Sequence, residues 1–269
     1  MGIGREANLG LSATDVASAF VEARRAGRTI SVYPGDRPAD LSAAYAIQDC
    51  ALALWQRDVG GWKVGRIPSP DDARLGADRL AGPIFADAIV VAGDSAPHMP
   101  VFAGGFAAAE AEFMLRLAPP PGAGVPTTNA EAAEWVDTIR IGIEIASSPY
   151  PGINSDGPCI TISDHGNNAG LVLGAEVGRD LWTDLDSIVV SMFIDERMVG
   201  RATTATMLDG PFGAVRFLLA NLHERAILPQ AGWWVSSGAI TGVHEIAAGS
   251  TFEANFDGIG TVRASATGF

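Results

Sequence analysis

An alternating run of isoleucines constrains the fold of this chain more than any other feature. In the segment VDTIRIGIEIASS, every second residue from position 139 to position 145 is isoleucine. The positions between them hold Arg140, Gly142 and Glu144. Successive side chains of a strand point to opposite faces of a sheet, so this alternation predicts a half-buried β-strand. Glu144 then lies on the polar face, where it must have a polar neighbour or face water.

A second segment, FAAAEAEFMLRLA, carries two further glutamates, Glu110 and Glu112. If this segment is also a strand, the two side chains share one face, with their Cα atoms roughly 6.5–7 Å apart. Three carboxylates gathered on sheet faces would repel one another unless a cation joins them, and hard divalent cations such as Mg²⁺ take oxygen ligands. The same segment is rich in Ala, Glu, Leu and Met, which favour a helix with both glutamates on its solvated side. The residues alone leave both interpretations open.

Composition and charge exclude several classes of function. A chain of 269 residues with 48% hydrophobic and 18% charged residues can bury a core, as one large domain or as two. Its formal net charge of −13 argues against nucleic acid and anionic membranes as partners. No stretch approaches the roughly 20 apolar residues of a membrane-spanning helix. The opening residues show no signal peptide, and the two cysteines, Cys50 and Cys159, suit a reducing compartment, so we expect a cytoplasmic protein.

Helical patterns dominate the beginning of the chain and strand patterns follow. Residues 12–27 form an amphipathic pattern that Ser12 can cap, and residues 42–58 form a second one that Gly60 and Gly61 end. A third helix is expected to begin near Pro211, and residues 119–133 have the composition of a surface loop. The pattern predicts an α+β protein with a helical or α/β N-terminal part, residues 1–75, and a mixed-sheet body, residues 76–269.

Five segments occur in an order typical of one family. They are GWKVGRIPSPDDARLGADRLAGPIFAD, AEAEFMLRL, IGIEIASSP, SDHGNNAGLVLG and SSGAITGVHEIAAGSTFEANFDGIGTV. With these segments the chain resembles, over nearly its whole length, the 2-keto-4-pentenoate hydratase and 4-oxalocrotonate decarboxylase branch of the fumarylacetoacetate hydrolase superfamily. The resemblance implies a mixed β-roll with a small helical or α/β N-terminal part, usually assembled into homo-oligomers.

The same resemblance assigns candidate site residues. It implies that Glu110, Glu112 and Glu144 bind one divalent metal ion, Mg²⁺ or Mn²⁺. Lys63 matches the family lysine that faces the bound substrate, and Asp78 matches an acidic residue of the active-site lid region, so both are candidate catalytic residues. The residues that match the loop around the substrate carboxylate are Ser237, Gly238 and Thr241.

One position departs from the family's usual pattern. Where the family often has V-A-D-N-A-S, this chain has ISDHGN, so His165 stands in place of an asparagine. His165 is a candidate acid, base or substrate contact, although a polar loop residue is the commoner role for such a histidine. Three arginines, Arg66, Arg74 and Arg79, follow the lysine motif and either receive a distal substrate carboxylate or remain solvated loop charges.

The implied function is a metal-dependent hydratase that adds water to a 2-hydroxy-2,4-dienoate and gives a 4-hydroxy-2-oxo acid. Such substrates belong to the meta-cleavage of aromatic compounds. A divalent cation can act as a Lewis acid on the C2 oxygen of a 2-oxo acid, and Lys63 would need a lowered pKa to act as a base. Four alternatives remain open: a 2-oxo-acid decarboxylase, an acylpyruvate hydrolase, a tautomerase, and a non-catalytic partner subunit. The expected partners are the small-molecule substrate and other copies of the chain, with or without a decarboxylase. The hydrolase would require a His–Glu pair, and no histidine precedes His98.

Overall fold

The computed structural model describes residues 12–93 and 95–269. Residues 1–11, for which the sequence predicts that no signal peptide is present, lie outside the described part. Within the described residues the helices are α1 (Ala13–Arg25), α2 (Leu41–Trp55), α3 (Asp71–Leu75), α4 (Asn129–Ala133), α5 (Pro158–Ser163) and α6 (Gly210–Glu224). Short 3₁₀ turns occupy Ala86–Ala88, His165–Asn167, Arg179–Leu181, Leu185–Ser187 and Thr204–Thr206. None of the described helices combines the length and the apolar character that a membrane crossing requires.

The first sheet of the described chain contains the strands that carry the candidate site. Its order is β2-β1-β10-β5-β6-β7-β3, and β11 pairs with the other end of β5. The bounds of these strands are β1 (Val59–Arg66), β2 (Arg79–Phe85), β3 (Ile89–Val91), β5 (Phe106–Leu117), β6 (Val136–Ser148), β7 (Asn168–Glu176), β10 (Trp234–Ser236) and β11 (His244–Glu245). Ile84 of β2, Met114 of β5 and Leu171 of β7 belong to one buried cluster. Strands far apart in the order therefore meet, which shows that this sheet curls on itself.

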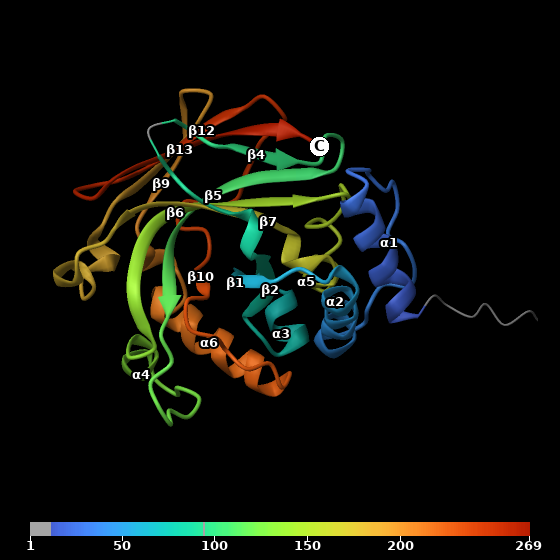
Figure 1. Cartoon of the computed structure of the whole chain (residues 1–269), viewed down its shortest axis with the longest axis horizontal. Coiled ribbons are helices and arrows are strands. Elements are labelled where there is room, and N and C mark those ends of the chain that lie inside the picture. Colours follow the sequence, from blue (N-terminus) through green and yellow to red (C-terminus); the bar gives the residue numbers. More distant parts are fainter. Residues whose placement is uncertain (1–11, 94) are drawn as a thin grey trace, which may run out of the picture.

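The second sheet packs against the apolar face of the first. Its order is β4-β13-β12-β8-β9, with bounds β4 (His98–Val101), β8 (Val190–Ile194), β9 (Arg197–Ala202), β12 (Thr251–Phe256) and β13 (Gly260–Gly268). In Figure 1 this sheet lies above the long strands β5 and β6. The rings of Phe113 and Phe256 meet across the interface with centroids 5.3 Å apart, and the isoleucines of β6 lie in the same core with 0% exposure.

The pairing of β5 with β6 confirms the alternation predicted from the sequence. The strands are antiparallel, and Glu110 pairs with Glu144 while Phe113 pairs with Ile141. Directly paired residues of an antiparallel ladder point to the same face. One face of this strand pair is therefore apolar and packs on the second sheet. The opposite face carries the three glutamates and lies on the inner, concave side of the first sheet.

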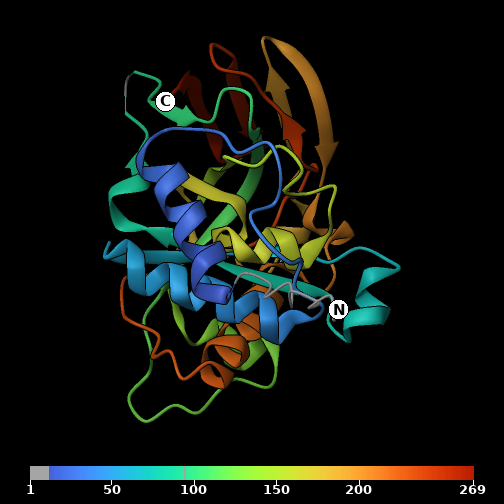
Figure 2. The same ribbon diagram turned by 90° about the vertical axis from the view of Figure 1, so that its right-hand side faces the viewer.

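The N-terminal helices cover one end of the curled sheet. Figure 2 shows α1 and α2 in front of the strands. Ser12 caps α1 by a reciprocal contact with Asp15, and Phe20 of α1 and Ile47 of α2 pack in one apolar cluster. Helix α6 lies below the sheet in Figure 1 and adds its apolar face, including Leu218, to the main core.

Three local expectations from the sequence were wrong. Helix α2 ends at Trp55 rather than residue 58, because Gln56 adopts a left-handed conformation, and Gly60 and Gly61 lie inside β1. The expected loop at 119–133 contains the short helix α4, which Thr128 caps. The helical alternative for FAAAEAEFMLRLA was also wrong, because this segment is the central strand β5.

Candidate metal centre and active site

Three buried glutamates converge on the polar face of β5 and β6. Glu110 lies directly opposite Glu144 in the ladder, and Glu112 is two residues farther along the same face of β5. The three residues are at most 4% exposed, and each offers a carboxylate oxygen within 4.8 Å of the others. The strand pairing therefore brings together, from distant parts of the sequence, the three residues that the resemblance assigned to a metal.

Each of two glutamates has one oxygen held by the protein and one without a partner. The Oε2 atom of Glu112 accepts hydrogen bonds from the Ser236 hydroxyl and, at 2.8 Å, from the Gly238 amide. The Oε1 atom of Glu144 accepts one from Asn168 Nδ2 at 2.9 Å. Within the described part of the chain, Glu112 Oε1 and Glu144 Oε2 are buried and have no hydrogen-bond partner. Such buried polar atoms are costly unless a ligand satisfies them.

The electrostatics of the cluster favour a cation. Burial and the charge of Glu144, against the lowering effect of Lys63, raise the pKa of Glu110 to about 7. Burial, together with the charges of Glu144 and Glu110, raises the pKa of Glu112 well above its ordinary value. Carboxylate oxygens are the donors that Mg²⁺ and Mn²⁺ accept, and the cluster offers three carboxylates, two of which each keep a buried oxygen without a partner among the described residues. The residues present therefore fit a hard divalent ion.

Lys63 supplies the positive charge beside this cluster. Its Nζ atom lies 3.4 Å from Glu144 Oε1 and donates a hydrogen bond to Asn167 Oδ1 at 3.2 Å. Burial by itself lowers the pKa of the ammonium, but the carboxylates of Glu144, Glu110 and Glu112 outweigh burial and raise it. Without another cation in the cluster, Lys63 is therefore an ammonium group, and the lowered pKa that base catalysis requires is not a property of this arrangement.

Lys63 and Glu110 form part of the wall of a cavity of about 740 Å³. The predicted substrate-binding residues Ser237, Gly238 and Thr241 line the same cavity. The Ser237 hydroxyl is buried and has no partner among the described residues, whereas the Thr241 hydroxyl is 3.1 Å from His244 Nε2. The positive φ of 107° at Gly238 suits glycine and lets its amide face Glu112. This loop thus joins the cavity wall to the glutamate cluster.

The structure does not bring Asp78 or His165 to the described cavity wall. The Asp78 side chain is 56% exposed and lies beside Arg79. His165 is fully buried between the rings of Trp55 and Phe85, with centroids 6.0 Å and 5.2 Å away. Burial, with a contribution from the Arg24 charge, lowers its pKa to about 3, so its imidazole is neutral. The catalytic roles of both residues stay predictions.

Two asparagines contact residues of the site, and neither was predicted from the sequence. Asn167 contacts Lys63 and also donates to Asn154 Oδ1 at 2.8 Å, and Asn168 contacts Glu144. The available signal was the adjacent polar pair Asn167-Asn168 at the point where the apolar strand β7 begins.

The basic residues after the lysine motif differ in their surroundings. Arg79 is buried at the cavity wall and forms an ion pair with Asp209. Arg74 is largely exposed and pairs with Asp71 at 2.7 Å. Arg66 is exposed and also lines the cavity. The indoles of Trp62 and Trp233 pack together in the core, with centroids 6.3 Å apart, rather than on the cavity wall.

Comparisons with known proteins agree with this geometry. A scan against models of protein families finds no match. The chain is 28% identical over 272 residues to a 2-keto-4-pentenoate hydratase of Burkholderia vietnamiensis (strain G4 / LMG 22486), an alignment that covers 95% of this chain and 98% of the relative.

Solved structures show the same fold. The chain matches 4-oxalocrotonate decarboxylase from Pseudomonas putida G7, complexed with magnesium and adipate, at a TM-score of 0.78 and 20% identity over 96% of this chain and 97% of the other. It matches fumarylpyruvate hydrolase from Pseudomonas aeruginosa, in complex with Mn²⁺ and pyruvate, at a TM-score of 0.55 and 17% identity over 77% and 89% of the two chains. The expected α+β roll is confirmed, and over almost its whole length the chain resembles the hydratase and decarboxylase branch of the fumarylacetoacetate hydrolase superfamily.

Proposed function

We propose that the protein is a divalent-metal-dependent hydratase that converts a 2-hydroxy-2,4-dienoate into a 4-hydroxy-2-oxo acid. The observation that carries the proposal is the buried cluster of Glu110, Glu112 and Glu144, with unpartnered oxygens, beside an ammonium group at the wall of a cavity of about 740 Å³. The similarity to a hydratase over almost the whole chain supports this reaction among those that such a cluster could catalyse.

The three glutamates would hold Mg²⁺ or Mn²⁺, and the bound ion would supply Lewis-acid stabilisation of negative charge on the substrate's C2 oxygen. The Ser236 hydroxyl and the Gly238 amide fix the orientation of Glu112, and Asn168 fixes that of Glu144. Hydrogen bonds of this kind orient the side chains that bind a metal ion.

Lys63 is placed to hold or move a proton at its Nζ atom. As an ammonium it can donate hydrogen bonds to an anionic substrate oxygen. One of its N–H groups already donates to Asn167 Oδ1, which orients the side chain. In the proposed reaction the 2-hydroxydienoate loses its hydroxyl proton and gains a proton at C5, which gives the conjugated ketone. Water then adds its hydroxyl at C4 and its proton at C3, so the atoms of one water molecule balance the product.

The loop of Ser237, Gly238 and Thr241 would receive the substrate carboxylate. Ser237 Oγ is a buried hydroxyl without a partner among the described residues, so it can donate to a bound carboxylate without losing an existing contact. Thr241 offers a second hydroxyl on the same wall.

A second candidate is a 2-oxo-acid decarboxylase of the 4-oxalocrotonate type. The fold match to 4-oxalocrotonate decarboxylase over 96% of the chain supports it. A dicarboxylate needs a second cationic contact, and Arg66 is the cavity-lining candidate, because Asp209 already pairs with Arg79. Hydrolysis of an acylpyruvate is less well supported, since no histidine is among the described residues that line the cavity. The intact set of Lys63 and three glutamates argues against a non-catalytic subunit.

The test is to incubate the protein with Mg²⁺ or Mn²⁺ and 2-hydroxypenta-2,4-dienoate while following the dienol absorbance and CO₂ release. Loss of the dienol without release of CO₂ supports the hydratase. A parallel assay uses 2-oxohex-3-enedioate as the substrate, and release of CO₂ from it supports the decarboxylase. Glu112→Gln should abolish turnover and weaken Mn²⁺ binding, because it replaces a ligand charge at a buried site. Glu253→Gln changes a glutamate of the second sheet and serves as the control. Full activity of Glu112→Gln would remove Glu112 from the ligand set.

Four further expectations stay predictions: a cytoplasmic location, a homo-oligomer with or without a decarboxylase partner, a role in aromatic catabolism, and a domain division at residue 75.

A further inference from the structure

A strained turn lies directly before β7. Its three residues, His165, Gly166 and Asn167, have φ angles of 54°, 62° and 60°, so each of them is left-handed. This conformation is unfavourable for residues other than glycine, although asparagine tolerates it better than most. Three such residues in succession persist only where the surrounding structure fixes them.

The turn and the first residue of β7 each bring one amide side chain to the glutamate and lysine cluster. Asn167 Oδ1 accepts a hydrogen bond from Lys63 Nζ at 3.2 Å, and Asn168 Nδ2 donates one to Glu144 Oε1 at 2.9 Å. The conformation of one short segment therefore sets the contacts of both Lys63 and Glu144.

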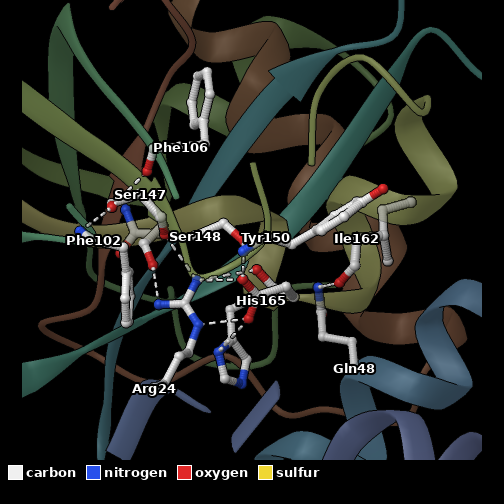
Figure 3. A network of polar contacts seen from close by, with 11 residues as sticks. Arg24, Gln48, Phe102, Phe106, Ser147, Ser148, Tyr150, Ile162 and His165 are labelled. Carbon is white, nitrogen blue, oxygen red and sulfur yellow. Dashed lines mark hydrogen bonds and ion pairs between the residues drawn. The ribbon is translucent and has the colours of Figure 1, made fainter. Parts of the chain in front are cut away.

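Arg24 of helix α1 forms hydrogen bonds with the residues on both sides of the turn, Asp164 and Asn168. Its guanidinium donates to both carboxylate oxygens of Asp164, at 2.5 Å and 2.8 Å, and to the carbonyl of Asn168 at 3.1 Å. A further bond reaches the carbonyl of Ser147 at 2.9 Å, and the Ser148 hydroxyl donates to Asp164 at 2.7 Å. Figure 3 shows Arg24 facing this network, with His165 beside it. The side chains of Arg24 and Asp164 are 9% and 0% exposed, so water does not compete strongly for these bonds.

Close packing leaves the turn little freedom to move. A Cβ atom at Gly166 would lie 3.0 Å from Gly82 Cα and 3.1 Å from Lys63 Cδ, and one at Gly82 would lie 2.3 Å from the His165 carbonyl oxygen. The His165 ring fills the apolar space between Trp55 and Phe85. Helix α1, through Arg24, and helix α2, through Trp55, thus both contact the segment that carries the turn.

We propose that Arg24 is a positioning residue: through Asp164 and the left-handed turn His165–Asn167, it sets the contacts of Asn167 with Lys63 and of Asn168 with Glu144. The inference rests on the proposed function, because it assigns a role to those two contacts. Arg24 itself touches neither the cavity wall nor a glutamate of the cluster among the described contacts, and it acts through the segment alone.

The test compares Arg24→Lys with Arg225→Lys. Arg225 is buried to a similar degree, with 8% side-chain exposure, and pairs with Asp49 outside the turn. Lysine keeps the charge but loses the two-pronged contact. For Arg24→Lys we expect a fall of about 10- to 100-fold in kcat and in the Mn²⁺ affinity of the metal-free protein, since contacts behind metal ligands have effects of this size. Values within twofold of those of Arg225→Lys would overturn the proposal.

A second pair of variants decides the matter if Arg24→Lys does not fold. Gly166→Ala and Gly76→Ala place a methyl group at left-handed positions with φ angles of 62° and 68°, but the methyl at position 76 meets nothing within 4 Å. We expect a similar backbone penalty in both, with kcat and Mn²⁺ affinity lowered only by Gly166→Ala. Equal kcat and affinity in the two variants would contradict the proposal.

Hydrogen exchange of the unaltered protein adds a measurement that needs no variant. The Asn167 amide donates to the Asp164 carbonyl at 2.8 Å, so a peptide spanning residues 160–170 should be protected before Mn²⁺ is added. Rapid exchange that slows only with Mn²⁺ would overturn the preformed turn. If the unaltered protein neither binds Mn²⁺ nor consumes the dienoate, the proposed function fails instead, so the two failures are distinguishable.

Discussion

Replacing His165 with asparagine should change how the stability of the protein depends on pH. The imidazole is fully buried between Trp55 and Phe85, and neither ring nitrogen has a hydrogen-bond partner among the described residues. Burial, and then the neighbouring Arg24 charge, lowers its pKa from 6.5 to about 3. Asparagine is a suitable replacement because it tolerates the left-handed φ of 54° at this position.

The size of the effect follows from proton linkage. Between pH 6.5 and pH 3 the unfolded chain binds a proton at His165 and the folded protein does not, so the free energy of unfolding decreases as the pH falls. The slope approaches roughly 1.4 kcal/mol per pH unit, which gives a loss of about 2 kcal/mol between pH 7.5 and pH 5. Glu110 and Glu112, with raised pKa values, contribute with the opposite sign: the stability they add at low pH is lost as the pH rises through their folded pKa values.

Urea unfolding at pH 7.5 and pH 5 isolates the histidine term, because the glutamate contributions are common to the unaltered protein and the variant. We expect the stability of the unaltered protein relative to His165→Asn to fall by about 2 kcal/mol between the two pH values. His223→Asn changes an exposed histidine of α6 and should show no such shift. A constant difference between the unaltered protein and His165→Asn would refute a buried neutral imidazole.

Two other predictions follow from the site and the core. The Mn²⁺ affinity of the metal-free protein should rise by about an order of magnitude between pH 6 and pH 8, because the raised pKa values of Glu110 and Glu112 make protons compete with the ion. Electron paramagnetic resonance measures this affinity, and an affinity independent of pH would contradict the prediction. Ile141→Ala should lower the free energy of unfolding by about 2–5 kcal/mol, since Ile141 is fully buried between the sheets. Val199→Ala, at a largely exposed position of β9, is the control, and equal losses in the two variants would show that the predicted sheet interface is wrong.

The alternation of β6 was predictable from sequence because one face is apolar without interruption. The period of two fixes which side chains share a face, and the structure places the isoleucines and Glu144 on opposite faces. Helix α1 was predictable for a similar reason, since Ser12 and Asp15 form a local capping contact. Both features depend on residues close in sequence, where intrinsic preferences and local hydrogen bonds decide.

Strand β5 shows where local preference fails. Its Ala, Glu, Leu and Met favour a helix, but both faces of the strand are buried, and pairing with β6 and β10 decides its conformation. The sequence alone left this choice open, and the family resemblance pointed to the strand. Tertiary context overrode intrinsic preference here.

The candidate site was predictable in its charged members and not in its supporting ones. Glu110, Glu112, Glu144 and Lys63 do come together. Asn167 and Asn168 escaped notice because their partners lie far away in the sequence and meet them only after the sheet has curled. His165 attracted attention as a polar residue next to a motif, but its ring faces Trp55 and Phe85, a direction that no local pattern reveals.

The metal site is tested most directly by a crystal structure of the protein with Mn²⁺ and oxalate, with anomalous scattering data that locate the manganese. We expect one ion held by a carboxylate oxygen from each of Glu110, Glu112 and Glu144, with oxalate on its open side facing the cavity. An ion bound elsewhere, or three carboxylates that turn away from one another while oxalate occupies the cavity, would contradict this expectation.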